Sequence, residues 1–189
     1  MKRVGILGGT FDPPHLGHLI IAEEVRLSLS LEEIWFIPSY TPPHKDEAKS
    51  SPEHRKKMLA HAIEGNKAFK MEALEIERSG KSYTVDTMKE LSERYPQTEF
   101  FFIIGADMVE YLPNWHRINE LIHLVTFAGV KRSGYKLDSP YPVVEVEVPT
   151  IDISSTFIRR RVKEGKTVNY FIPESVYAYM KENKLYENK

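Results

Sequence analysis

Short apolar runs alternate along the chain with longer segments in which apolar residues recur every three or four positions. The short runs are apolar, β-branched or aromatic, which is typical of buried strands, and the longer segments are typical of amphipathic helices. Strands that alternate with helices form parallel sheets covered on both faces. The pattern therefore predicts an α/β fold with a Rossmann-like, doubly wound parallel sheet. The predicted strands cover residues 4–7, 34–37, 69–76, 100–104, 124–130 and 143–148.

Three helices are predicted between the strands. The second has the clearest ends, because Ser51 is a suitable N-cap, Pro52 fits the first helical position and Gly65 stops the helix. The first covers about residues 17–29, and the third runs from near Thr84 to Pro96.

The end of the sequence has a different pattern, with two helical segments and little strand between them. They cover about residues 154–163 and 173–184. We interpret them as a small helical portion that closes the sheet within a single domain of residues 1–189. A chain of 189 residues buries roughly 70% of its unfolded surface, which is enough for a stable core.

Composition excludes several classes of protein. The sequence has no cysteine, so disulfides, thiolate metal sites and cysteine nucleophiles are ruled out. A net charge of −1 gives no reason to expect nucleic acid or an anionic membrane as a partner. No signal peptide and no run of roughly 20 apolar residues is present, so we expect a soluble, cytoplasmic protein.

The most informative segment covers residues 8–18, between the first predicted strand and the first helix. It begins with a glycine turn, Gly8-Gly9, and delivers two imidazoles, His15 and His18, where the helix starts. A glycine turn lets backbone N–H groups approach a phosphate, and a helix N-terminus favours negative charge. Two histidines add donors for developing charge. The segment therefore indicates phosphoryl or nucleotidyl transfer.

Other interpretations of this segment are weaker. Its glycines do not fit the G-x-G-x-x-G dinucleotide pattern or the P-loop pattern. A packing or capping role explains one histidine, but explains the pair in this setting less well. A zinc site needs a third ligand from the remaining histidines or carboxylates, which we consider a minor alternative.

Further candidates follow other predicted elements. Lys45 ends a proline-stiffened loop, Gly105 and Asp107 end the central strand, and Arg132 follows another strand. The segment 154–159 combines hydroxyl caps with Arg159 and suggests a pyrophosphate seat. Purely structural roles stay open for several candidates. Lys45 could be a solvated surface lysine, and Asp107 could cap the helix that follows. Trp115, a candidate for stacking on a planar ring, could instead pack in the core.

Taken in order, these motifs resemble a known family. The H-x-G-H pair of residues 15–18 and the S-S-T-x-I-R segment of residues 154–159 resemble the nucleotidyltransferase superfamily of α/β phosphodiesterases. Within it, the chain is similar to the bacterial nicotinate-nucleotide adenylyltransferases over nearly its whole length. The motifs that carry this closer similarity are residues 42–45, 82–84, 105–107, 112–115 and 131–132.

The resemblance implies a reaction: ATP and nicotinate mononucleotide give nicotinate adenine dinucleotide and pyrophosphate, with Mg²⁺ held through the ATP phosphates. It implies catalytic roles for His15, His18, Lys45 and Arg159. It also implies ATP-binding roles for Gly8, Gly9, Thr10, Phe11, Gly105, Asp107, Ser154 and Ser155. Residues implied to bind nicotinate mononucleotide are Ser39, Lys45, Thr84, Tyr111, Trp115 and Arg132.

Several alternatives stay open. A sister transferase acting on phosphopantetheine, or a cytidylyltransferase, shares the H-x-G-H core. A non-catalytic nucleotide-binding module would keep the pocket without turnover. The family often forms dimers, so a homodimer is a possible assembly. The sequence also leaves open whether the acid or the amide form of the mononucleotide is preferred.

Overall fold

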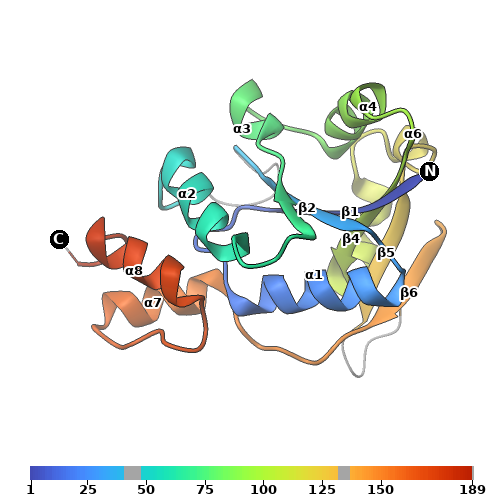
Figure 1. The fold of residues 1–189 in the computed structure, drawn as a ribbon. Helices are drawn as coiled ribbons and strands as arrows, with labels where there is room; N and C mark the ends of the chain where they lie inside the picture. Colours follow the sequence, from blue (N-terminus) through green and yellow to red (C-terminus); the bar gives the residue numbers. More distant parts are fainter. Residues whose placement is uncertain (41–47, 132–136, 189) are drawn as a thin grey trace.

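A six-stranded sheet, in which every pair of neighbouring strands is parallel, organises the computed structural model, which describes residues 1–40, 48–131 and 137–188. The strand order is β3-β2-β1-β4-β5-β6, so the predicted doubly wound Rossmann-like fold is confirmed (Figure 1). The strands are β1 (Lys2–Gly9), β2 (Glu33–Pro38), β3 (Phe69–Met71), β4 (Thr98–Gly105), β5 (Thr126–Lys131) and β6 (Val143–Glu147).

Each predicted apolar run contains a strand, but the third was interpreted wrongly beyond Met71. The helix α3 (Leu74–Arg78) occupies the rest of that run, and both Leu74 and Ile76 are buried in it. Pairing of β3 with β2 ends at Met71, and the amide of the next residue donates to the Phe36 carbonyl at 2.9 Å. A short apolar run does not distinguish strand from helix, which is why periodicity failed here.

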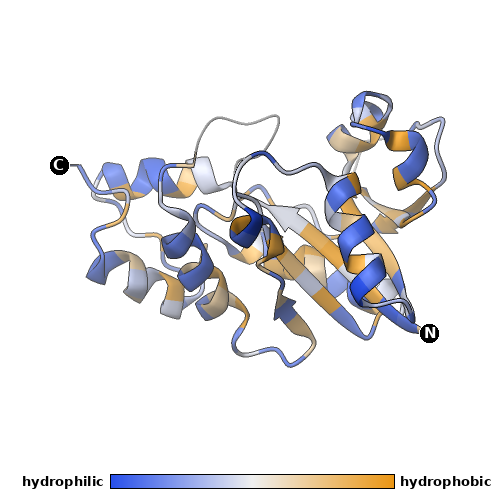
Figure 2. Ribbon diagram, turned by 90° about the horizontal axis from the view of Figure 1, so that it is seen from above, coloured by the Kyte–Doolittle hydropathy of each residue, from blue (hydrophilic) through white to orange (hydrophobic). Residues whose placement is uncertain are grey.

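Helices cover both faces of the sheet, and side chains that alternate along β4 serve both cores. Phe100, Phe102 and Ile104 face the core under α3, α4, α5 and α6, whereas Phe101 and Ile103 face the core under α1 and α2. Figure 2 shows apolar residues concentrated in the strands. The helices are α1 (Leu16–Ser28), α2 (Pro52–Ile63), α4 (Thr84–Arg94), α5 (Ala106–Tyr111), the 3₁₀ turn η1 (Leu112–Asn114) and α6 (Ile118–Leu121).

The last two helices, α7 (Ser155–Lys163) and α8 (Glu174–Glu182), form a third core against α2. The buried members of this C-terminal cluster are Met58, Ile158, Val168, Ile172, Val176 and Met180. The helices therefore extend the layer beside α2 (Figure 1). That they also close the sheet stays a prediction. Their apolar stripes are completed by one another and by Met58. That all residues form one domain stays a prediction.

The strand order reverses between β1 and β4, whose carboxyl ends lie side by side. Ligands of open α/β sheets bind outside the carboxyl ends of the strands at such a reversal. Gly9 ends β1 and Gly105 ends β4, so the fold brings two predicted site segments to this edge. None of the helices in the described ranges is long and apolar enough to cross a membrane.

We expect Ile158→Ala to lower the free energy of unfolding by roughly 2–5 kcal/mol, because Ile158 is fully buried in the C-terminal cluster. Urea unfolding measures the change. Leu27→Ala is the control, since Leu27 is 57% exposed and its truncation should change stability by less than about 0.5 kcal/mol. Equal effects of the two substitutions would contradict the packing role of this cluster.

Candidate active site

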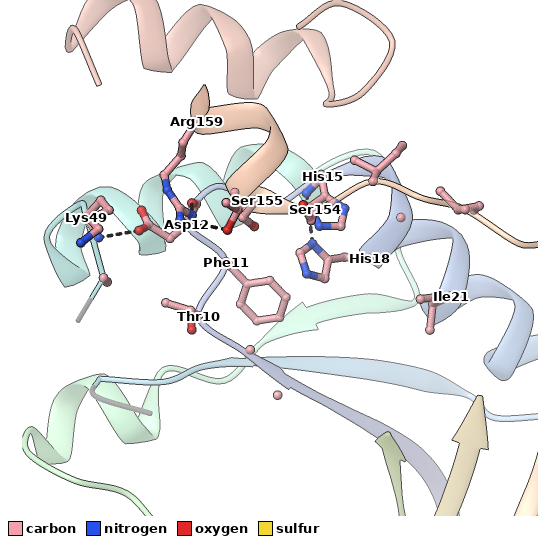
Figure 3. A pocket seen from close by; sticks show the side chains of 17 residues that line it. Thr10, Phe11, Asp12, His15, His18, Ile21, Lys49, Ser154, Ser155 and Arg159 are labelled. Carbon is pink, nitrogen blue, oxygen red and sulfur yellow. Dashed lines mark hydrogen bonds between the residues drawn. The ribbon is translucent and has the colours of Figure 1, made fainter. Parts of the chain in front are cut away.

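A pocket of about 650 Å³ opens at the carboxyl end of β1, between the N-termini of α1 and α7 (Figure 3). It brings together nine predicted residues from two distant parts of the sequence, together with Gly17, Ile21 and Lys49, among others. The nine are Gly8, Gly9, Thr10, Phe11, His15, His18, Ser154, Ser155 and Arg159.

The two histidines of the pocket fix each other in place. His15 is the N-cap of α1, and its backbone N–H donates to Nδ1 of His18 at 3.2 Å. Their rings stack, with centroids 3.6 Å apart and planes inclined by 25°. Phe11 approaches the His18 ring edge-on at 5.0 Å. Because Nδ1 of His18 accepts a hydrogen bond, the neutral ring carries its proton on Nε2 and is a donor there.

His15 is kept neutral by burial. Its side chain is only 6% exposed, and desolvation lowers the pKa of the imidazole to about 4. Its Nδ1 is buried with no hydrogen-bond partner within the described protein. Gly17 allows this packing, since a Cβ there would lie 3.0 Å from the His15 ring. The glycine of the H-x-G-H motif therefore makes room for its first histidine.

The start of α7 is bound to the loop that precedes α1. Nη1 of Arg159 donates to the Asp12 carbonyl at 2.8 Å, and Oγ of Ser155 donates to the Pro13 carbonyl at 2.8 Å. Oγ of Ser154 accepts from the Phe157 amide at 3.1 Å and caps the helix. Both predicted serine hydroxyls therefore have structural roles, and their contact with a triphosphate stays a prediction.

Two helix N-termini thus converge on one pocket. Each carries partial positive charge and amide donors in its first turn, which favours an anion. Arg159 adds a full positive charge at the pocket wall. The arrangement is suited to binding a polyphosphate and to stabilising charge that develops on it.

Sequence reasoning missed Asp12, which is 3% exposed. Its carboxylate accepts from the Lys49 amide at 2.6 Å, from the Tyr186 hydroxyl at 2.5 Å and from the Ser50 hydroxyl (Figure 3 shows the first of these). These donors come from the segment before α2 and from the segment after α8. Asp12 lies within the segment 8–18 that the sequence analysis singled out, so its place near the site could be predicted. Its hydrogen-bond partners are distant in the sequence and could not.

Sequence reasoning also missed Arg55 of α2, which is fully buried. Its guanidinium donates to the carbonyls of Thr10 at 3.0 Å, Ser39 at 2.5 Å and Tyr40 at 3.1 Å. It therefore joins the segments that follow β1 and β2. A signal existed: Arg55 precedes the apolar Met58 and Leu59 by three and four positions, which places it on the buried face.

Other predicted residues do not line this pocket. Ser39 is buried at the end of β2, where its amide donates to the Gly9 carbonyl at 2.9 Å. Gly105 and Asp107 begin α5 at the neighbouring strand end, and Thr84, Tyr111 and Trp115 belong to elements over the opposite sheet face. Their predicted ligand contacts stay predictions. Lys45 and Arg132 lie outside the described residues.

Trp115 is half-buried, and part of its ring packs against the core. Its ring meets Phe102 and Phe127 edge-on, at centroid distances of 5.8 and 6.0 Å. Its indole Nε1 is buried with no hydrogen-bond partner among the described residues. Across the described ranges, no group of three or more His, Cys, Asp or Glu is placed to hold a metal ion.

The sheet order and the histidine pocket at its switch point define a protein that handles nucleotide phosphates. A family model described as cytidylyltransferase-like agrees and matches residues 6–161. Curated relatives narrow the class. The nicotinate-nucleotide adenylyltransferase of Bacillus subtilis (strain 168) is 51% identical over 189 residues, covering all of both chains. A protein of Oceanobacillus iheyensis, named a probable nicotinate-nucleotide adenylyltransferase, is 54% identical over 98% of this chain and 97% of its own.

The chain therefore belongs to the nicotinate-nucleotide adenylyltransferase family. A solved structure supports the fold: the Plasmodium falciparum nicotinic acid mononucleotide adenylyltransferase complexed with NaAD superimposes with a TM-score of 0.81. It is 22% identical to this chain, and the match covers 98% of each chain. The same enzyme complexed with APC gives the same TM-score of 0.81.

We expect His15 to make stability depend on pH. The folded imidazole has a pKa of about 4, against 6.5 for the ordinary group, so the unfolded state binds more protons between these values. The stabilisation is fully present above pH 6.5 and is lost as the pH falls toward 4. Between pH 7 and pH 5, the wild type should lose about 2 kcal/mol more than His15→Asn.

Urea unfolding at the two pH values measures this difference. His123→Asn is the matched control, because His123 is exposed and its removal should leave the wild-type pH dependence unchanged. Parallel pH profiles for the wild type and His15→Asn would contradict the buried, neutral state of His15.

Proposed function

We propose that this chain transfers the adenylyl group of ATP to nicotinate mononucleotide, giving nicotinate adenine dinucleotide and pyrophosphate in NAD biosynthesis. The observation that carries the proposal is the pocket in which His18 and Arg159 meet from two helix N-termini. The chain is identical to curated adenylyltransferases at more than half of the aligned positions, which supports the choice of substrates.

The chemistry asks little of a general base. The mononucleotide phosphate is already an anion, and one of its oxygens attacks the α-phosphorus of ATP in line. The new P–O bond forms as the bond to the β-phosphate oxygen breaks, and pyrophosphate leaves with that electron pair. Holding the reactants in line can contribute about 7–11 kcal/mol. The protein acts mainly by positioning two polyanions and stabilising their transition-state charge.

His18 is suited to the transferring phosphate. Because Nδ1 accepts the His15 amide, the neutral ring carries its proton on Nε2, and the neighbouring rings of His15 and Phe11 restrict its orientation. A preorganised donor of this kind costs little reorganisation as charge develops, and it can contribute about 3–4 kcal/mol. We propose that His15 supports His18 and donates to phosphate as a neutral group.

The remaining assignments follow the family resemblance. We propose that Arg159 and the α7 N-terminus hold the triphosphate with Lys45, and that Gly105 and Asp107 hold the adenosine. Thr84, Tyr111, Trp115, Arg132 and Ser39 are proposed to surround the pyridine nucleotide. Position supports the assignments of Ser39 and Gly105, which lie at the carboxyl ends of β2 and β4, and the others rest on the family resemblance alone.

Mg²⁺ is proposed to enter as part of the ATP substrate. Among the described residues of the pocket wall, one is a carboxylate, that of Asp12, and three protein donors already engage it. Mg²⁺ commonly retains water and binds substrate phosphates instead of an all-protein cage, which suits this site. Homodimer formation stays a prediction of the resemblance.

We expect His18→Ala to lower kcat by roughly 10²–10³-fold, with a much smaller change in KM, because the lost donor acts mainly on transition-state charge. Pyrophosphate release under saturating substrates measures kcat. His123→Ala, at an exposed position shortly after α6, serves as the control. Near-normal kcat in His18→Ala would remove His18 from the mechanism.

An acceptor panel tests the proposed substrate. With ATP as donor, nicotinate mononucleotide should release pyrophosphate fastest, ahead of nicotinamide mononucleotide and phosphopantetheine. CTP with a cytidylyl acceptor covers the remaining sister activity. A faster reaction with any of these alternatives would replace the proposed substrate. ATP binding without turnover of any acceptor would instead indicate a nucleotide-binding module.

A further inference from the structure

Tyr186 reaches the active-site loop from a point 174 positions away in the sequence. Its hydroxyl donates to Oδ1 of Asp12 at 2.5 Å and lies 3.2 Å from Oγ of Ser50. The sulfur of Met58, in α2, lies 3.9 Å from the same hydroxyl. The segment after α8 is thus connected with the loop that precedes the H-x-G-H motif.

The phenol is fixed as a donor. Burial and the neighbouring Asp12 carboxylate raise the pKa of Tyr186 above its ordinary range, so the hydroxyl keeps its proton at any physiological pH. The backbone at Tyr186 has a φ of 64°, in the left-handed region that non-glycine residues rarely occupy. Such a conformation persists where surrounding contacts determine it.

Asp12 links the Tyr186 hydroxyl to the backbone that leads into the two histidines. Its carboxylate is held by Tyr186, Ser50 and the Lys49 amide, and its carbonyl is held by Arg159. The next carbonyl, of Pro13, accepts from Ser155. His15, whose amide orients the His18 ring, follows two residues later. The position of the His18 donor therefore depends on how firmly Asp12 is held.

We propose that Tyr186 is a positioning residue of the adenylyl transfer, which acts by fixing Asp12 and thereby the His15–His18 pair. The inference deepens the proposed function and rests on it. Tyr186 does not line the histidine pocket, so its effect on the reaction should pass through the loop and not through substrate contact.

Tyr186→Phe in the full chain removes the hydroxyl and keeps the ring. We expect kcat to fall on the order of tenfold, because small displacements of a reacting group are costly, while KM for either substrate changes less than about twofold. Tyr179→Phe is the matched control. Its hydroxyl bonds Nδ1 of His54 at 2.9 Å within the C-terminal cluster and does not touch the loop, so kcat should be unchanged.

A second background separates positioning from general stability. In His18→Ala, adding Tyr186→Phe should lower kcat less than about twofold, because the donor that Tyr186 positions is already gone. An equal fold-change in both backgrounds would overturn the proposal. Should Tyr186→Phe fail to fold, Ser50→Ala removes the other hydroxyl donor to Asp12 and should show the same pattern with a smaller fall.

NMR signals of the imidazole rings give a readout that does not need turnover. Tyr186→Phe should shift the signals of His15 and His18, and Tyr179→Phe should leave them in place. Unshifted rings in a folded Tyr186→Phe would overturn the proposal even with an active wild type. An inactive wild type with shifted rings would instead count against the proposed function alone.

Discussion

A buried carboxylate needs partners, and the satisfaction of Asp12 is the constraint on which the candidate site depends. A charge removed from water is very costly unless hydrogen bonds replace its hydration. Asp12 meets this need with an amide and a hydroxyl from the segment before α2 and a hydroxyl from the segment after α8. Satisfying one side chain therefore fixes the loop before α1 to two segments that lie far apart in the sequence.

The parallel sheet explains why this loop lies where phosphate chemistry is possible. β1 and β4 are neighbouring central strands with adjacent carboxyl ends. The segments that follow these two strands therefore both begin at the point where the strand order reverses. The strand β1 continues through Gly8 and Gly9, the short segment after it leads into the N-terminus of α1, and contacts of this segment bring the N-terminus of α7 beside it. Two positive helix ends then face one cavity with a donor imidazole between them.

Much of this could be predicted from local sequence, and the limits are physical. The six strands and the main helices followed from periodicity and capping residues, because strand and helix spacing is a local property. The motif at residues 8–18 indicated phosphate chemistry for the same reason. The predicted strand 69–76 was wrong from Leu74 onward, because the few apolar positions there fit a strand or a helix equally well. The packing of α7 and α8 against α2 was not predicted, because an amphipathic stripe does not specify which surface it covers.

The site itself was predictable only where the motif carries its own geometry. His15 and His18 share one helix turn, so their proximity was available from spacing. That Ser154 and Ser155 seat a triphosphate stays a prediction, and the structure adds a helix cap by Ser154 and a hydrogen bond from Ser155 to the Pro13 carbonyl. Asp12 and Tyr186 belong to the same network, but no local rule links positions so far apart. Arg55 was also missed, although its place on the apolar stripe of α2 indicated burial.

The C-terminal cluster adds a thermodynamic consequence for any ligand of the histidine pocket. A ligand that contacts the residues of both α1 and α7 in this pocket would bind only molecules in which the cluster is docked. Its apparent dissociation constant would equal the intrinsic value divided by the docked fraction. Packing of Ile158 and Val176, neither of which lines the pocket, would then set part of the affinity for that ligand. By linkage, binding of the ligand would also suppress opening of α7 and α8.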